Sequence, residues 1–301
     1  MDGPVLFPVD DSPCAAAARP HAVAFARRCD ATLLALHVVD TSVGRSSVVR
    51  EPLERRGRAL LSSVERRAAR AGVAVETLQR TGRPHEEILD AVDERDAAAV
   101  AMGTHGRRGV DRLLLGSVTE RVVRRAPVPV LTVGLLPAER GESAASSDYP
   151  GLSDGPDAAT YDAVCLRTDG SEAAAVALEP AVDLAVHDDA TLHVLHVTAV
   201  ETLGYDVRSA SVLGDLAEAG RGYVDDLADR AREAGVADVT TAVREGVPST
   251  AICAYADEHD VGCVTMGTDG RTGLRRALIG STTERVLRTT PRPVLTVPAR
   301  E

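Results

Sequence analysis

The sequence Met102-Gly-Thr-His-Gly-Arg-Arg-Gly-Val-Asp-Arg-Leu-Leu-Leu-Gly-Ser117 occurs twice in this chain, in two closely related forms. Its second copy is Met266-Gly-Thr-Asp-Gly-Arg-Thr-Gly-Leu-Arg-Arg-Ala-Leu-Ile-Gly-Ser281. In both copies, two residues separate a first glycine from a second, at Gly103 and Gly106 or at Gly267 and Gly270. Nine further residues then precede a Gly-Ser pair. When residues 100–133 are aligned with residues 264–297, 22 of 34 positions are identical. The chain is therefore an internal duplication of one structural unit.

Each copy predicts a strand, a glycine loop and a helix, in that order. Residues 97–102 and 261–266 are short apolar runs, typical of strands buried on both faces. The glycines allow the backbone to turn sharply and to approach another group closely. An amphipathic helix then begins at each Gly-Ser pair. A strand, a loop and a helix N-terminus in this order can hold phosphate on backbone N–H groups.

The same stretch also has an interpretation without a ligand. Ser117-x-x-Glu120 and Ser281-x-x-Glu284 each fit a capping box, which needs no bound group. The glycines alone could mark turns. The spacing matches neither a Walker A sequence nor the dinucleotide fingerprint, and the chain contains no lysine. From this motif alone, a phosphate site and a plain turn are equally good interpretations.

Length and composition limit the class of protein. The 301 residues agree with two domains. No apolar run approaches the roughly 18 residues of a membrane span, and we expect no membrane segment or signal peptide. The five cysteines are odd in number and never form Cys-x-x-Cys, which favours reduced thiols and a cytoplasmic location. We therefore expect neither a disulfide framework nor a zinc site.

The charge balance is acidic. Asp and Glu number 45 against 34 basic residues, which gives a net charge of −11, and aromatic residues make up only 2%. A nucleic-acid partner is not expected, because no basic face with stacking aromatics is visible. A lysine-free acidic surface suits a halophilic protein kept soluble at high salt, and a GC-rich genome gives the same bias. Both explanations stay open.

The hydrophobic patterns place five strands and four helices in each half. In the first half, strands are expected at about 4–9, 31–39, 73–79, 97–102 and 127–133, and helices at 13–28, 51–71, 84–94 and after Ser117. In the second half, strands are expected at about 163–166, 191–197, 239–244, 261–266 and 291–297, and helices at 171–187, 212–234, 248–259 and after Ser281. The predicted organisation is a domain at 1–133, a Gly/Ser/Pro-rich linker at 134–160 and a domain at 161–301.

Alternating strands and helices predict an α/β fold, with a doubly wound parallel sheet in each half. The order of the strands does not follow from spacing. If the first and fourth strands are neighbours, their carboxyl ends meet at the point where a ligand binds in open α/β sheets. Asp10 would then face the Gly103 loop, and Asp169 would face the Gly267 loop.

At this point the chain resembles a tandem universal stress protein, over both halves except the linker. The resemblance is carried by the Gly-x2-Gly-x9-Gly-Ser loop and the aspartate that closes the first strand. It is also carried by the Leu-His-Val strands (residues 36–38 and 195–197) and the final Pro-x-Pro-Val-Leu-Thr-Val. The resemblance implies two Rossmann-like domains of the adenine nucleotide α-hydrolase type, each with a five-stranded sheet of order 3-2-1-4-5. It also implies binding of ATP or AMP, with Mg²⁺ bridging the phosphates.

The resemblance further implies which residues hold the nucleotide. Asp10 and Asp169 would contact the adenosine, Val38 and Val197 would line the adenine pocket, and Gly103 and Gly267 would lie near the ribose. The implied site in the first half consists of Pro8, Val9, Asp10, Val38, Met102, Gly103, Gly106, Arg107, Gly116, Ser117 and Val118. In the second half it consists of Thr168, Asp169, Val197, Met266, Gly267, Gly270, Arg271, Gly280, Ser281 and Thr282. The last strands, Val130–Val133 and Val294–Val297, would pair within one chain as a pseudo-dimer, and a larger homodimer stays open.

The two halves depart from the family pattern in different ways. Family members commonly read Pro-Thr-Asp-Gly-Ser after the first strand. The first half has Asp11 as a second carboxylate there, and the second half has Arg167 where proline is usual. Asp269 also stands where the first half has His105. An added carboxylate repels polyphosphate unless a metal or an arginine compensates, so we expect the two sites to differ.

Three functions stay open from the sequence. The first is a nucleotide-binding protein of stress response or regulation without fast turnover, since no catalytic residues or metal ligands stand out. The second is a slow ATP hydrolase, and the third is a dimerising scaffold without nucleotide. His37 and His196 occupy equivalent strand positions and are expected to be structural. His193-x-x-His196 is not expected to bind metal, because residues three apart on a strand face opposite sides.

Overall fold

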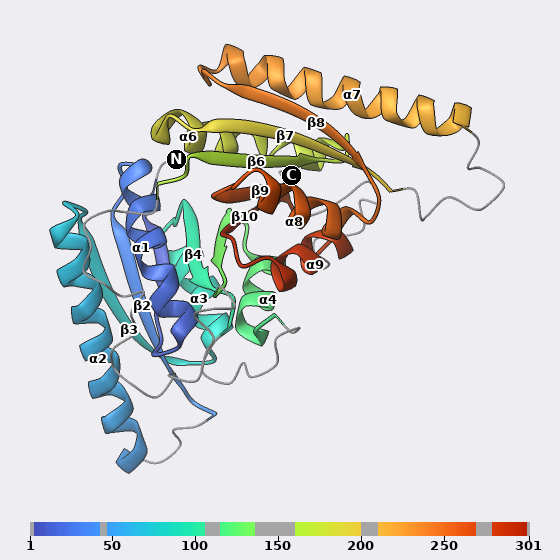
Figure 1. The fold of residues 1–301 in the computed structure, drawn as a ribbon. Helices are drawn as coiled ribbons and strands as arrows, with labels where there is room; N and C mark the ends of the chain where they lie inside the picture. The colour runs from blue at the N-terminus through green and yellow to red at the C-terminus, as the bar shows by residue number, and fades with distance from the viewer. Residues whose placement is uncertain are drawn as a thin grey trace. The chain divides into compact units, whose positions relative to one another are not determined.

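The structure, a computed structural model, describes residues 3–42, 47–105, 115–135, 160–199, 210–268 and 279–299. The chain divides into two compact units, Met1–Ala159 and Thr160–Glu301. Each unit contributes its own strands and helices, and in Figure 1 the colour runs from blue to green over the first unit and from yellow-green to red over the second. Among the described residues, no helix combines the length and the apolar character needed to cross a membrane.

The first unit is a five-stranded parallel sheet with a helix in each crossover. Its elements are β1 (Val5–Pro8), α1 (Pro13–Arg28), β2 (Leu33–Asp40), α2 (Ser47–Arg70), β3 (Val75–Gly82), α3 (Pro84–Glu94), β4 (Ala99–Gly103), α4 (Ser117–Arg125) and β5 (Val130–Val133). The strand order is β3-β2-β1-β4-β5. The register aligns Val5 with Leu33 of β2 and with Ala99 of β4. The order 3-2-1-4-5 is therefore confirmed.

The strand order follows from which strands are apolar throughout. Side chains in β4 are all buried, and Val5, Leu6 and Phe7 of β1 have no exposed surface. Strands of that kind must be covered on both faces, so they lie in the middle of a parallel sheet. The polar strand β3 is half exposed and forms the edge. Right-handed crossovers then place α1 and α2 on one face, in mutual contact, and α3 and α4 on the other.

The second unit repeats this arrangement. Its elements are β6 (Ala163–Thr168), α5 (Glu172–Ala175), α6 (Leu178–Asp188), β7 (Thr191–Thr198), α7 (Ala210–Glu233), β8 (Val239–Glu245), α8 (Pro248–Glu258), β9 (Cys263–Gly267), α9 (Ser281–Thr289) and β10 (Val294–Val297). The order β8-β7-β6-β9-β10 has the same topology as the first unit. In Figure 1, α2 lies along β2 and β3, and α7 lies along β7 and β8. Two copies of one doubly wound fold are thus confirmed.

Two predicted helices differ from the structure. The helix expected at 171–187 is broken into α5 and α6, and the break includes Val176. Pro180 has no N–H to donate to the carbonyl of Val176, and its ring crowds that carbonyl, so a continuous helix is disfavoured there. The helix expected to begin near residue 51 begins at Ser47 and carries Pro52 inside it. The helix therefore starts four residues earlier than expected, and Pro52 lies beyond its first turn.

Candidate functional site

The loops that follow β1 and β4 come into contact at the carboxyl end of the first unit's sheet. A Cβ added at Gly103 would lie 2.6 Å from the carbonyl carbon of Cys14 and 2.8 Å from the nitrogen of Ala15. The Thr104 hydroxyl lies 3.9 Å from the Cys14 sulfur. Gly103 is thus required for α1 to start against the end of β4. In the second unit β6 likewise pairs with β9, so the first and fourth strands are neighbours in both.

An aspartate orders the turn after the first strand in both units. Ser12 N donates to Asp10 Oδ1 at 3.0 Å, and Ala15 N donates to the Ser12 hydroxyl at 3.2 Å, which caps α1. In the second unit Ser171 N donates to Asp169 Oδ1 at 3.1 Å. Ala174 N donates to the Ser171 hydroxyl, also at 3.1 Å. Both turns are therefore built alike, and each leaves one carboxylate oxygen for other contacts.

The charges around the two aspartates differ. Arg167 Nη1 lies 3.4 Å from Asp169 Oδ2, and only 9% and 12% of the two side chains are exposed. The first unit has Pro8 at the position of Arg167, so Asp10 lacks that arginine. Its second carboxylate, Asp11, instead forms an ion pair with Arg56 of α2. The charge of Asp169 in the second unit is thus offset by an arginine of the strand that precedes it.

The helices that follow the glycine loops begin without a side-chain cap. Gly116 is the N-cap of α4 and Gly280 is the N-cap of α9, and neither helix has a capping bond from a side chain. The two predicted capping boxes are therefore wrong. Ser117 and Ser281 are the first helical residues, one position too late to cap. Their presumed partners bond along the helix instead, as Glu120 does with Arg124 at 2.6 Å and Glu284 does with Arg288.

Backbone and threonine bonds fix the start of each uncapped helix. Gly116 N donates to the carbonyl of Thr104 at 2.9 Å, and the Thr119 hydroxyl donates to the carbonyl of Gly103 at 2.9 Å. In the second unit Gly280 N and the Thr283 hydroxyl make the same bonds at 2.8 and 2.9 Å. The sequence reasoning missed both threonines, although the shared Thr-Glu-Arg in the two copies was a signal for them. The first-turn N–H groups are thereby held in place at the end of the strand.

The remaining predicted residues lie at these strand ends or outside the described part of the chain. Val9, Met102, Met266, Thr168, Val38 and Val197 are buried, Pro8, Val118 and Thr282 are partly exposed, and Ser117 and Ser281 are exposed. The hydroxyl of Thr168 accepts a bond from Gly170 N at 3.1 Å. Gly106, Arg107, Gly270 and Arg271 lie outside the described residues.

The histidines on β2 and β7 have structural contacts. His37 Nδ1 donates to the carbonyl of Val9 at 2.8 Å, and His196 Nδ1 donates to the carbonyl of Thr168 at 3.1 Å. These bonds hold the end of the first strand to the second strand. His193 instead bonds the Tyr255 hydroxyl at 2.9 Å. Within the described residues, no group of three or more His, Cys, Asp or Glu is placed to hold a metal ion.

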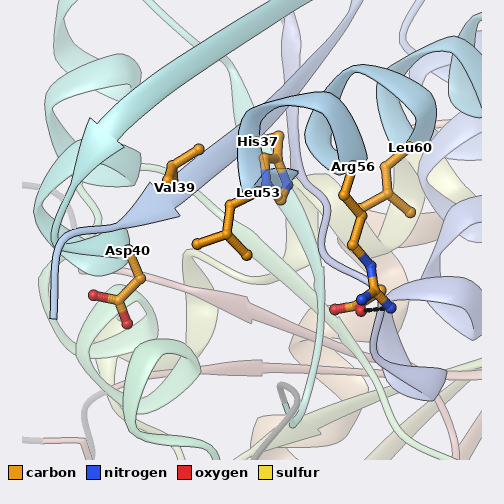
Figure 2. A pocket seen from close by; sticks show the side chains of 7 residues that line it. His37, Val39, Asp40, Leu53, Arg56 and Leu60 are labelled. Atoms are coloured by element: carbon orange, nitrogen blue, oxygen red, sulfur yellow. Dashed lines mark ion pairs between the residues drawn. The ribbon is translucent and has the colours of Figure 1, made fainter. Parts of the chain in front are cut away.

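A small hollow lies beside this region in the first unit. Figure 2 shows it between β2 and α2. Its lining residues are Asp11, His37, Val39, Asp40, Leu53, Arg56 and Leu60. His37 and Val39 face it, so Val38 between them points to the other side of the strand. The hollow adjoins the turn at Asp10, but its lining includes none of the residues predicted to bind nucleotide. It is not the predicted site.

Comparison with known proteins identifies the family. The sequence model of the universal stress protein family matches residues 1–134 and 160–298. A universal stress protein of Methanocaldococcus jannaschii is 35% identical over 136 residues, which are 43% of this chain and 80% of that protein. One of Bacillus subtilis is 29% identical over 147 residues, 44% of this chain and 99% of that protein.

A solved structure extends the likeness over both units. The universal stress protein from Archaeoglobus fulgidus superposes with a TM-score of 0.69 at 23% identity and covers 99% of both chains. At that identity the likeness establishes the fold. The family match, in contrast, is found separately in each repeat. The chain therefore belongs to the universal stress protein family and carries two copies of its domain in tandem.

Proposed function

We propose that each repeat binds an adenine nucleotide, ATP or AMP, at the carboxyl ends of its first and fourth strands. The observation that carries this proposal is the pair of uncapped helix starts, α4 and α9, that follow the two glycine loops. A helix N-terminus without a cap presents backbone N–H groups and a partial positive charge to an anion. The phosphates would bind there, on the N–H groups of residues 117–119 and 281–283.

The other parts of the site support the same orientation. The adenosine would lie toward Asp10 and Asp169, whose turns are ordered by Ser12 and Ser171. Val38 and Val197 would line the base, with Pro8, Val9, Thr168, Met102 and Met266 around it. Gly106 and Gly270 would hold the phosphates, and Arg107 and Arg271 would contact them. Mg²⁺ would bridge phosphate oxygens and reduce the repulsion from nearby carboxylates.

The role we propose is regulation in a stress response, with the bound nucleotide as the regulatory signal and not as a rapidly consumed substrate. The polar groups at the described strand ends already have structural partners: the aspartates order turns, and His37 and His196 donate to carbonyls. None of them stands as a general base with its own orienting partner, which fast hydrolysis would need. Slow hydrolysis is measured directly as phosphate release.

Nucleotide content is the first test. The purified protein is denatured, released adenine nucleotide is quantified per chain, and ATP with Mg²⁺, AMP and cAMP are titrated into stripped protein. The panel includes cAMP because a universal stress protein has been crystallised in complex with it. We expect two equivalents of ATP or AMP per chain. An absence of both release and binding would favour the scaffold hypothesis.

Two variants test the phosphate position without disturbing the fold. Ser117→Glu and Ser281→Glu each place a carboxylate at the first helical residue, where it favours the helix by about 0.3–1 kcal/mol but repels phosphate. We expect each variant to lose one equivalent of nucleotide and to keep its thermal stability. Val186→Glu is the matched control, because Val186 is 49% exposed on α6, a helix that carries none of the residues proposed to bind nucleotide. Full binding by both serine variants would place the phosphates elsewhere.

A further inference from the structure

The longest helices of the two units can be compared position by position. In α2, Gly57 lies against the His37 ring, since an added Cβ would approach its Cδ2 to 2.2 Å. In α7, Gly220 lies against the His196 ring in the same way, at 2.6 Å. Because His37 and His196 hold equivalent strand positions, Gly57 and Gly220 are equivalent too. This contact therefore defines which position of α7 is equivalent to each position of α2.

In that alignment, one exposed stripe of residues is positively charged on α2 and negatively charged on α7. Residues spaced by four, three, four and four lie along one face of a helix. On α2 the stripe is Arg55, Ala59, Ser62, Arg66 and Arg70, and on α7 it is Glu218, Gly222, Asp225, Asp229 and Glu233. All the charged members of both stripes are exposed. Three positions carry arginine in the first unit and a carboxylate at the equivalent place in the second.

The other residues near each stripe carry mostly the same sign of charge as the stripe itself. Residues 50–70 of α2 contain seven arginines and three glutamates, whereas residues 214–233 of α7 contain six acids and three arginines. The charged residues of the neighbouring α1 are all arginine. Burial lowers the pKa of Arg19 on α1, and so do the nearby Arg67 and Arg66 of α2. Like charges are therefore gathered on the face formed by α1 and α2.

The corresponding face of the second unit gathers carboxylates. The charged residues of α6 are Glu179, Asp183 and Asp188, besides His187. Burial raises the pKa of Asp183, and so does the nearby Glu179. Like charges gathered on one exposed face repel one another, and a surface of opposite charge reduces that repulsion. The chain itself contains that surface, on the equivalent helices of its other unit.

Small residues also lie between the charged positions of the stripes. Ala59 and Ser62 separate the arginines on α2, and Gly222, with nothing within 4 Å of an added Cβ, interrupts the acids on α7. Some members form pairs along their own helix, such as Arg55 with Glu51 and Asp229 with Arg232. These pairs are exposed, and exposed pairs of this kind are weak and readily exchanged. Helix can thus approach helix with charge facing charge.

We propose that the α2 stripe of one copy of this chain docks against the α7 stripe of a second copy. The gaps between the three charged positions are the same on both helices, so every arginine meets a carboxylate when the two helices run parallel. The contact joins two different surfaces and is therefore head-to-tail, which permits a closed ring or a longer assembly. It does not depend on bound nucleotide.

The first test is the mass of the wild-type protein. Sedimentation velocity over a concentration series at about 0.05 M salt is compared with the same series at about 1 M, where charges more than about 3 Å apart are screened. We expect assembly at low salt that weakens at high salt. A mass that does not depend on concentration at low salt would overturn the proposal.

Charge reversal tests the two surfaces. One variant carries Arg55→Glu, Arg66→Glu and Arg70→Glu, and the other carries Glu218→Arg, Asp229→Arg and Glu233→Arg. Alone, each presents the same sign on both helices, and we expect self-association to weaken on the order of tenfold or more. Mixed in equal amounts, the two variants again offer opposite signs, and we expect assembly to return.

A control separates the stripes from net charge. Glu86→Arg, Asp90→Arg and Asp93→Arg on α3 shift the net charge as much as the α7 reversal does, on exposed positions of another face. We expect this variant to assemble like wild type. Assembly that survives both stripe reversals, or that fails to return when the two are mixed, would show that the stripes do not meet. Circular dichroism of every variant establishes that it is folded.

Discussion

His193 is a buried polar residue that the duplication does not explain, because its equivalent in the first unit is the apolar Leu34. Its ring lies 5.3 Å from that of His259 and donates or accepts a bond with the Tyr255 hydroxyl at 2.9 Å. The rings of Tyr255 and His259 are 4.2 Å apart, and the Arg244 guanidinium lies over Tyr255. Burial lowers the pKa of His193, and the neighbouring His259 lowers it further. The cluster is thus built around a neutral imidazole.

This arrangement predicts a loss of stability in mild acid. The unfolded chain binds a proton at His193 near pH 6.5, whereas the folded chain binds it only at lower pH. The free energy of unfolding therefore falls as the pH drops below about 6.5, and this group has no effect above about pH 7. Urea unfolding at several pH values below 6.5 and at one above 7 measures how steeply the free energy of unfolding depends on pH. We expect His193→Leu to make the slope shallower, while His21 and His85, whose pKa values burial also lowers, retain part of it.

Tyr255→Phe is the control for this experiment. It removes the hydroxyl that bonds His193 but leaves the imidazole buried beside His259, so the slope should persist. A slope in His193→Leu equal to that of wild type would mean that other groups cause the acid sensitivity.

At the scale of elements, each long helix rests on its sheet through one glycine. Gly57 of α2 lies on the ring of His37, and Gly220 of α7 lies on the ring of His196. Each histidine is held by a bond to a backbone carbonyl, so its ring cannot move aside freely. These contacts set the distance from α2 to β2 and from α7 to β7.

Alanine at these glycines should therefore be destabilising, although alanine is the better helix former. We expect Gly57→Ala and Gly220→Ala to lower the free energy of unfolding by roughly 1–2 kcal/mol, because overpacking outweighs the gain in propensity. Gly214→Ala is the matched control: Gly214 lies in α7 with open space around it, and alanine there should add up to about 1 kcal/mol. In a double-mutant cycle, His37→Ala should abolish the cost of Gly57→Ala. An unchanged cost would place the strain elsewhere.

Much of the architecture at this scale was predictable, and the exceptions have physical reasons. The alanine-rich composition placed the helix at 13–28, and the acidic first turn placed the helix at 84–94, both with the bounds that the structure has. The break before α6 was missed because apolar spacing does not record which carbonyl Pro180 leaves without a donor. The capping boxes were wrong because Ser-x-x-Glu reads the same whether the serine is the N-cap or the first helical residue.

The sequence allowed the residues of the candidate site to be predicted, but not most of the contacts between them. The two aspartates, the glycines and the Gly-Ser pairs were recognisable because the chain carries each of them twice. The approach of Gly103 to Cys14 depends on how α1 packs, which no local pattern encodes. Arg167 stood out only as a departure from proline, and its ion pair with Asp169 required the three-dimensional structure. Residue types thus follow from local chemistry, whereas their partners follow from packing.

At the scale of the whole molecule, the chain is two copies of one fold that have diverged at matching positions. Arg167 and Tyr223 in the second unit replace Pro8 and Leu60 in the first. The Tyr223 ring lies beside His196 and against Gly170, whereas the first unit has the small hollow and the Asp11–Arg56 ion pair in this place. The pairing of the two last strands stays a prediction. Of these differences, the pair of Arg167 and Asp169 lies at the proposed nucleotide site, so we expect the two sites to differ in affinity.

Separate sites predict that nucleotide stabilises each unit on its own. A ligand that binds only the folded state stabilises it by about 2.7 kcal/mol at 100 times its Kd. Hydrogen exchange of wild type with saturating ATP should show added protection in residues 3–135 and in residues 160–299. In Ser117→Glu, the first group should lose its added protection while the second keeps it. Ser281→Glu should give the mirror image. If either variant lost the added protection in both groups, the two repeats would bind nucleotide as one coupled site, and the reading of two independently tuned halves would be wrong.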